Sequence, residues 1–136
     1  MYVHYDDITG KIYGCMRIPP TTVIANVALL PENTSLIEWP DSVDENLYYF
    51  DGANSFIIRP TIDVSLNKTT IASDGLDTCS LTGLPIPCLI TIDEQEFTFN
   101  GSEGDSFEFA TETSGVYKIT LTQFPYIPKT IEVEAI

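Results

Sequence analysis

The second half of the chain alternates apolar and polar residues with a period of two, in short runs separated by turn residues. Successive side chains of a β-strand point to opposite faces, so this pattern predicts strands with one buried face and one wet face. We expect strands at residues 62–66, 69–72, 77–82, 88–92, 95–99, 106–110, 116–122 and 129–134. Short strands at such regular spacing are typical of an antiparallel β-sandwich.

The same alternation predicts which side chains fill the core between the sheets. The positions expected to face inward are Cys79, Leu81, Ile90, Ile92, Phe97, Phe99, Phe107, Phe109, Tyr117, Ile119, Leu121, Ile131 and Val133. The residues between them are polar, as Thr98, Glu108 and Lys118 illustrate. Each sheet can therefore pack through one face only.

The first half of the chain predicts two β-hairpins. Residues 2–5 and 12–16 form the first around a turn that contains Gly10, and residues 47–50 and 55–58 form the second. Residues 36–39 form a further strand. A threonine cap at Thr21 or Thr22 predicts a short helix through about Leu30, although β-branched residues in this segment weaken its helical propensity.

The strand pattern changes at Arg59-Pro60-Thr61, where a proline ends one run before a new alternation begins. A chain of 136 residues can hold one domain or two modest modules. We therefore expect a mainly β protein with two parts. An N-terminal β-hairpin-rich docking module spans residues 1–60, and an immunoglobulin-like antiparallel β-sandwich spans residues 61–136.

Composition and net charge exclude some classes of binding partner. Hydrophobic residues make up 43% and charged residues 19%, which favours a globular fold. The net charge of −14 repels phosphate backbones and anionic lipid headgroups, so we expect neither nucleic-acid binding nor membrane insertion. The first residues lack the pattern of an export signal, and the longest apolar run is shorter than the roughly 20 residues of a membrane span, which predicts assembly in a cytoplasm.

The sequence contains no motif typical of catalysis. His4 is the only histidine, and no nucleophile-elbow, phosphate-loop or zinc-protease pattern is present. Cys15, Cys79 and Cys88 have no zinc-ligand spacing, and reduced thiols are expected. Paired carboxylates for glycoside hydrolysis are not singled out among the many acidic residues. We expect a protein that is not an enzyme and uses no cofactor.

Acidic residues gather in two groups of loops. One group consists of Asp93, Glu94, Glu96, Glu103 and Asp105, and the other of Asp41, Asp44, Glu45 and Asp51. Neither group has the spacing of a calcium-binding EF-hand. Solvated loops are the favoured interpretation, a surface cation in either group stays an alternative, and we expect no metal site.

Aromatic residues suggest where the chain binds a partner. The candidate interface residues are Tyr2, Tyr5, Trp39, Tyr48, Tyr49 and Tyr126. Aromatic surfaces serve protein interfaces and sugar stacking, but they also complete small cores, which is the favoured interpretation for the first module. Tyr126 lies in the proline-bounded segment 124–128, which predicts a rigid loop at one end of the sandwich.

Tyr117 follows a turn glycine and opens an alternating strand, as does the tyrosine of an immunoglobulin-like tyrosine corner. Its hydroxyl is expected to bond to backbone a few residues upstream. Ile119 stands where antibody-type domains carry their second disulfide cysteine, and Trp39 lies in the other module, so we expect no cross-sheet disulfide.

Several motifs together resemble the immunoglobulin-like domains of tailed-bacteriophage virion proteins. They are Ser73-Asp74-Gly75-Leu76-Asp77-Thr78, Thr82-Gly83-Leu84-Pro85-Ile86-Pro87-Cys88, Gly115-Val116-Tyr117 and Phe124-Pro125-Tyr126-Ile127-Pro128. The first is also similar to the opening strand of invasin-type bacterial repeats. The leading module, with its hairpin around Gly10 and its closing run up to Pro60, is similar to short phage tail proteins.

The resemblance implies a structural component of the virion, at the tail tip or on a tail fibre, assembled in the host cytoplasm. It implies docking to other virion proteins in several copies, and it supplies no catalytic residues. The alternatives are a host-receptor or carbohydrate-binding module, a capsid decoration protein, and an assembly factor that never enters the particle.

Overall fold

The computed structural model describes residues 1–17, 30–53, 55–102 and 104–136. Except for Leu30, the helix expected from Thr21 or Thr22 lies outside these residues. The described residues form β-strands, turns and irregular segments, without a helix. Over the same ranges no helix is long and apolar enough to cross a bilayer. The chain divides into two units, Met1–Pro60 and Thr61–Ile136.

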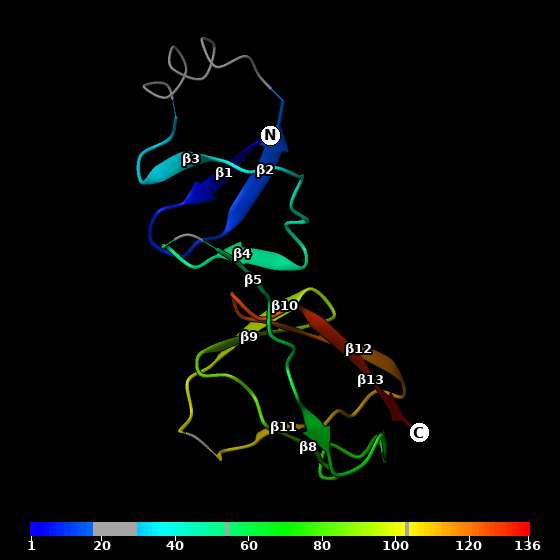
Figure 1. The fold of residues 1–136 in the computed structure, drawn as a ribbon. Helices are drawn as coiled ribbons and strands as arrows, with labels where there is room; N and C mark the ends of the chain where they lie inside the picture. The colour runs from blue at the N-terminus through cyan, green and yellow to red at the C-terminus, as the bar shows by residue number, and fades with distance from the viewer. Residues whose placement is uncertain (18–29, 54, 103) are drawn as a thin grey trace. The chain divides into compact units, whose positions relative to one another are not determined.

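The first unit contains a three-stranded antiparallel sheet of order β2-β1-β3 and a separate hairpin of β4 and β5 (Figure 1). The strands are β1 (Tyr2–Asp6), β2 (Ile12–Met16), β3 (Thr34–Glu38), β4 (Tyr48–Phe50) and β5 (Phe56–Ile58). Val3 lies opposite Cys15 on one side and Ile37 on the other, at the centre of the sheet, and is fully buried.

Aromatic rings complete the small core of this unit. Tyr5 packs on Phe50 with ring centroids 4.4 Å apart, and Phe50 packs on Phe56 at 5.2 Å. Trp39 meets Phe56 edge-on at 4.8 Å. Such ring pairs contribute about 0.5–1.5 kcal/mol each beyond the area they bury. Because few aliphatic side chains of the described unit are buried, these contacts form a large share of its packing.

Gly10 belongs to the turn of the first hairpin and also contacts the backbone of β4. Its φ of 77° lies in the left-handed region, and its amide donates to the Asp6 carbonyl at 2.9 Å. Its own carbonyl accepts the Phe50 amide, also at 2.9 Å. A Cβ at this position would lie 1.9 Å from the Phe50 carbonyl oxygen. Glycine is therefore required both by the turn and by the close approach of the two backbones.

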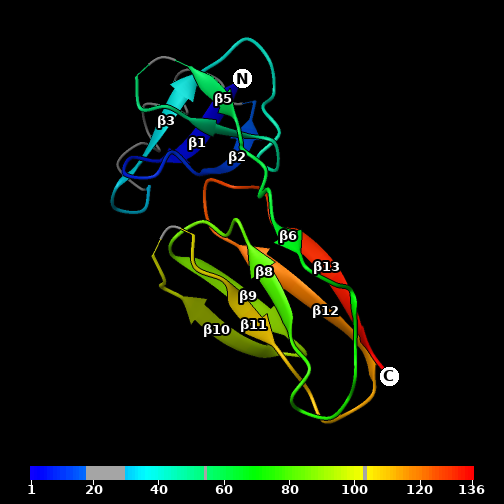
Figure 2. The ribbon, with the colours of Figure 1, turned by 90° about the horizontal axis from the view of Figure 1, so that it is seen from below.

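The second unit contains two sheets that form separate layers (Figures 1 and 2). One has the order β11-β8-β6 and the other β10-β9-β12-β13-β7. All pairs are antiparallel except the parallel pair β13 and β7. The strands are β6 (Ser65–Leu66), β7 (Thr70–Ile71), β8 (Cys79–Thr82), β9 (Cys88–Ile92), β10 (Gln95–Phe99), β11 (Phe107–Phe109), β12 (Gly115–Thr122) and β13 (Lys129–Ala135).

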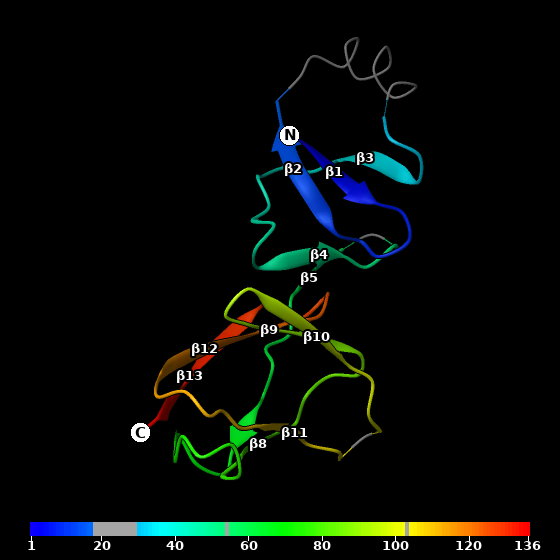
Figure 3. The ribbon, with the colours of Figure 1, turned by 180° about the vertical axis from the view of Figure 1, so that it is seen from behind.

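Both sheets contribute to one hydrophobic core. Cys79 and Leu81 of β8 belong to the same buried cluster as Ile90, Ile119 and Val133 of the larger sheet, and all five are fully buried. The layers that enclose this cluster can be followed from behind in Figure 3. The expected all-β architecture with antiparallel sheets is confirmed for the described residues.

Two local predictions need correction. The strand expected at 62–66 is reduced to Ser65–Leu66, which pairs with β8 only at Thr82 and Leu81, and Thr61 just before it makes an isolated parallel bridge to Ile127. Phe97 was expected in the core, yet it remains 42% exposed. Its side chain points to the inner face as the alternation predicts, but β10 is an edge strand and no strand covers it from the side.

We predict that Gly10→Ala destabilises the first unit by more than the roughly 1–2 kcal/mol that a left-handed conformation costs a residue with a Cβ. The excess reflects the clash with the Phe50 carbonyl. Urea unfolding followed by the fluorescence of Trp39, the only tryptophan, measures this unit selectively. Gly52→Ala is the matched control. Gly52 also has a left-handed φ, of 83°, but a Cβ added there would have no neighbouring atom within 4 Å. Equal losses in the two variants would contradict the proposed clash.

Candidate functional site

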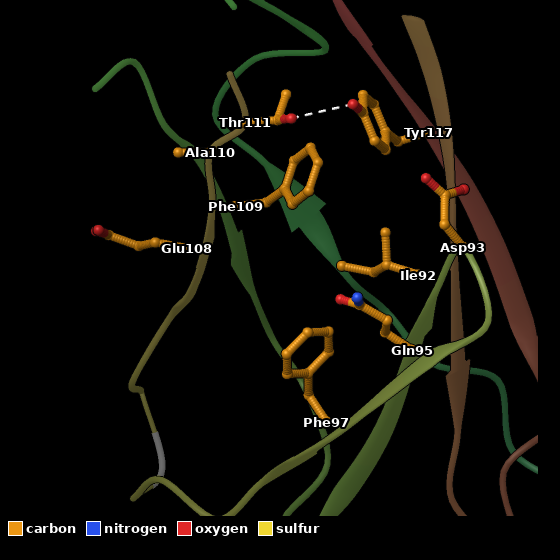
Figure 4. A pocket seen from close by; sticks show the side chains of 9 residues that line it. All are labelled: Ile92, Asp93, Gln95, Phe97, Glu108, Phe109, Ala110, Thr111 and Tyr117. Atoms are coloured by element: carbon orange, nitrogen blue, oxygen red, sulfur yellow. Dashed lines mark hydrogen bonds between the residues drawn. The ribbon is translucent and has the colours of Figure 1, made fainter. Parts of the chain in front are cut away.

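An open groove of about 350 Å³ lies on one side of the second unit, between β10 and β11 (Figure 4). Each of these strands has a single neighbour, β9 for β10 and β8 for β11, so both are sheet edges. The lining residues are Ile92, Asp93, Gln95, Phe97, Glu108, Phe109, Ala110, Thr111 and Tyr117. The groove is therefore the unclosed side of the two-layer arrangement.

Aromatic side chains from both layers form the groove walls. Phe97 projects from β10 and Phe109 from β11, and both point into the opening in Figure 4. Phe97 lies 6.2 Å from Phe107, and Phe109 lies 5.1 Å from Tyr117, measured between ring centroids. Phe109 and Tyr117 pack against the core, whereas Phe97 stays partly in solvent. The aromatic part of the wall is thus incompletely covered.

Tyr117 closes one end of the groove with a polar contact. Its hydroxyl donates to the Thr113 carbonyl at 2.7 Å, which is the upstream backbone bond expected from the sequence. The same hydroxyl lies 3.0 Å from Thr111 Oγ1, the contact drawn in Figure 4. The ring is half-buried against the core. The interaction anchors the start of β12 to the chain segment that follows β11.

The rim of the groove is acidic. Asp93 and Glu94 form the turn between β9 and β10, and Glu96 and Glu108 are exposed on the two edge strands. Figure 4 shows Glu108 directed away from the opening. None of the nine lining residues is basic. An occupant of this groove would meet aromatic rings and polar groups, with acidic residues on the adjacent strands.

A second candidate site lies in the first unit. A pocket of about 290 Å³ is lined by Trp39, Ser42, Val43, Tyr48 and Phe56. The structure thus brings two of the predicted interface residues, Trp39 and Tyr48, into one pocket. Phe56 also lines this pocket, although the sequence pattern at that position predicts only a strand. The aromatic run on the facing hairpin strand is the sequence signal that points to it.

The other predicted interface residues lie elsewhere. Tyr2 and Tyr49 are half-buried on β1 and β4, and Tyr5 packs on Phe50 within the aromatic core. Tyr126 belongs to the second unit, where it is half-buried and packs against the hydrophobic cluster. Tyr2, Tyr5 and Tyr49 are not among the described residues that line the pocket of Trp39 and Tyr48.

Several carboxylates of the acidic loops accept hydrogen bonds from backbone amides and so stabilise turns. Asp44 accepts the Asn46 amide at 2.9 Å, Asp51 accepts the Ala53 amide at 2.8 Å, and Asp105 accepts the Ser102 amide at 2.7 Å. Glu103 lies outside the described residues. Within the described ranges no three histidine, cysteine or acidic side chains converge as metal ligands do.

The segment after β7 contains two carboxylates with lowered pKa values. Asp77 accepts hydrogen bonds from the Lys68 ammonium and the Ala72 amide, and these hold its pKa below the ordinary 3.8. Asp74 accepts the amides of Asp77 and Leu76, which also lower its pKa. Both groups therefore act as ionised turn anchors, rather than as proton donors near neutral pH.

The cysteines and the histidine show no catalytic arrangement in the described chain. Cys15, Cys79 and Cys88 are free thiols, and burial raises the pKa of Cys79 and Cys88. Protonated thiols are poor nucleophiles. The His4 ring lies 5.2 Å from that of Tyr13, and its buried Nε2 has no hydrogen-bond partner among the described atoms.

Comparison of the chain with models of protein families, with curated proteins and with solved structures finds no match.

We predict that Tyr117→Phe destabilises the second unit by about 0.5–1.5 kcal/mol, because the Thr113 carbonyl loses the Tyr117 hydroxyl as a donor. Hydrogen exchange of β12 and β13 amides in urea, followed by mass spectrometry, measures this unit separately. Thr111→Val is a companion variant that leaves the Tyr117 bond to Thr113 in place. It removes the contacts of Thr111 Oγ1 with the Tyr117 hydroxyl and with the Thr113 backbone, so it measures the contribution of the threonine itself. An unchanged exchange profile in Tyr117→Phe would show that the corner bond is not stabilising.

We also predict acid sensitivity of the second unit through Asp77. Its pKa is lower in the folded chain than its ordinary value of 3.8, so its stabilisation is complete above about pH 5 and is lost as pH falls through the folded-state pKa. The stability difference between wild type and Asp77→Asn should therefore shrink steadily below that pH. Asp63→Asn, which removes an exposed carboxylate of the same unit, should keep the wild-type pH profile. A pH-independent difference for Asp77→Asn would contradict the proposed role.

Proposed function

We propose that this chain is a non-catalytic structural component of a tailed-bacteriophage virion, a tail tip or tail fibre accessory protein. In this proposal the first unit docks on another virion protein, and the second unit is an immunoglobulin-like β-sandwich that the particle displays. The chain is assembled in the host cytoplasm and occupies several symmetry-related positions.

The strand order of the second unit supports the immunoglobulin-like part of the proposal. In such sandwiches the first, second, fourth and fifth strands share one sheet, while the third, sixth and seventh share the other. The sheets β6-β8-β11 and β9-β12-β13 fit this division without an equivalent of the fourth strand among the described residues, and β10 and β7 are additional edge strands of the larger sheet. Tyr117 occupies the tyrosine-corner position at the start of β12, the strand equivalent to the sixth.

The observation that carries the docking proposal is the open aromatic pocket of Trp39, Tyr48 and Phe56. Aromatic anchors seated in a partner dominate the energy of many interfaces, at about 2 kcal/mol or more per anchor. Repeated copies on a symmetric particle multiply this gain, because each further contact is made at high effective concentration. A small subunit can therefore be held without a large interface per copy.

Charge and chemistry support a protein partner over other classes. The net charge of −14 opposes contact with nucleic acid. The carboxylates of Asp44, Asp51, Asp74 and Asp77 are engaged in turns and an ion pair. Their hydrogen bonds stabilise local turns, which favours the aromatic pocket over these carboxylates as the binding surface.

The proposal predicts that the chain is present in purified particles of the phage that encodes it, and that Trp39→Ala lowers its copy number per particle at least about tenfold. Quantitative mass spectrometry of particles measures both. Trp39→Phe should restore much of the incorporation, because it retains a ring in the pocket. Ile8→Ala is the matched control, since Ile8 is 79% exposed in the same unit and lies outside the pocket.

Absence of the wild-type chain from particles would overturn the virion proposal. Normal incorporation of a folded Trp39→Ala variant would place docking on another surface. A density map of the particle then distinguishes tail from capsid, because a decoration protein differs from a tail protein in its position.

A carbohydrate-binding module is the second candidate, because Ser42 places a hydroxyl beside the aromatic rings of the pocket. Sugars bind such sites by stacking on a ring and bonding to neighbouring polar groups. Binding of the isolated protein to a glycan array, with loss in Trp39→Ala, would favour this function over docking to a virion protein.

A further inference from the structure

We propose that the free edge of β10 is a strand-addition site for an extended, basic segment of a partner protein. The segment would continue the larger sheet beyond β10 and place alternate side chains in the groove between β10 and β11. This inference concerns the second unit and does not rest on the virion assignment or on the Trp39 pocket.

The register of the hairpin shows which backbone groups of β10 face outward. Asp93 and Glu94 form a two-residue turn with φ values of 46° and 68°, and Gln95 pairs with Ile92 across it. The residues that flank such a turn exchange hydrogen bonds, and bonding then alternates along the ladder. The N–H and C=O groups of Glu96 and Thr98 therefore point away from β9, toward the free edge.

The groove offers space for side chains of an added strand. Gln95 and Phe97 turn inward from β10, and Phe109 faces them from β11 (Figure 4). A strand next to β10 would direct every second side chain into this opening of about 350 Å³. Apolar side chains there would cover Phe97, which is 42% exposed without an occupant. Backbone pairing and apolar burial would thus act together, as in known strand-addition complexes.

The charge of the residues around the groove indicates which kind of peptide segment would bind there. Asp93 lines the groove, and Glu94 and Glu96 are exposed on the same hairpin, while no lining residue is basic. Glu96 alternates with Gln95 and Phe97, so it lies on the sheet face where the outward side chains of an added strand would also lie. A second copy of this chain carries the same net charge of −14 and would bring a second acidic edge against the first. Like charges on neighbouring strands are destabilising, whereas opposite charges favour pairing. The geometry and charge together fit a segment that alternates basic and apolar residues.

The edge of β10 also lacks several usual protections. Natural edge strands are often blocked by proline, lysine or a bulge. The sequence Gln95-Glu96-Phe97-Thr98-Phe99 contains neither proline nor lysine, and its register with β9 is continuous. Glu96 supplies a charge that opposes self-association but attracts a basic partner.

The test uses the full chain and a synthetic peptide of about eight residues that alternates lysine with valine. We expect saturable binding by isothermal titration calorimetry and slower hydrogen exchange of the Glu96 and Thr98 amides in the complex. Affinity should fall when salt is raised from about 0.05 M to about 0.5 M, because screening weakens the contacts to the acidic rim. Peptides that alternate lysine with serine, or glutamate with valine, should bind at least about tenfold more weakly.

Thr98→Pro and Thr98→Val form the matched pair of variants. Proline at position 98 removes an outward N–H while the bonds of β10 to β9 are kept, which edge strands tolerate. Valine keeps that N–H. We expect Thr98→Pro to weaken peptide binding at least about tenfold and Thr98→Val to bind like the wild type, with circular dichroism confirming that both are folded.

Three results would overturn the proposal. The first is no binding of the lysine-valine peptide to wild-type protein. The second is equal affinity for the lysine-serine peptide, which would show attraction by charge alone. The third is unchanged affinity or amide protection in a folded Thr98→Pro variant. None of these results bears on incorporation through Trp39, so the two proposals fail separately.

Discussion

Burial of one face of each strand is the constraint on which the second unit depends. Leu81 of the smaller sheet and Ile90, Ile119 and Leu121 of the larger sheet are fully buried in one cluster. Burying each such side chain stabilises the fold by about 1.5–3 kcal/mol, so a one-residue slip of register, which would expose the whole set, is strongly disfavoured. With this register in place, Tyr117 reaches the Thr113 carbonyl and Phe97 is left at an edge.

Among its described residues the first unit buries fewer aliphatic side chains. Val3 and Ile12 are buried at its centre, and aromatic rings and the contact of Gly10 with the Phe50 backbone add to its packing. A core completed by aromatic side chains leaves some of them partly open to solvent. Trp39 has this double role, because it packs edge-on against Phe56 and also lines the pocket.

The two surfaces that we assign to binding differ in chemistry. The pocket around Trp39 and Tyr48 offers rings and a hydroxyl, while the groove beside Phe97 offers a free strand edge within an acidic rim. The groove arises where β10 and β11 have no further neighbouring strand in the described chain, and the pocket lies where aromatic side chains of the first unit are only partly buried. Both surfaces offer groups that can bind a partner protein, which is the basis of the two proposals.

The sequence by itself determined most of the strands, the turn role of Gly10 and the inward set from Cys79 to Val133, because period-two alternation and turn residues act locally. It also indicated the upstream hydrogen bond of Tyr117. Only the tertiary structure decided that β10 and β11 are edges, that Phe97 stays exposed, and that Phe56 joins Trp39 in a pocket. Strand order depends on pairing between residues distant in the chain, and alternation along one strand carries no information about which neighbour covers it.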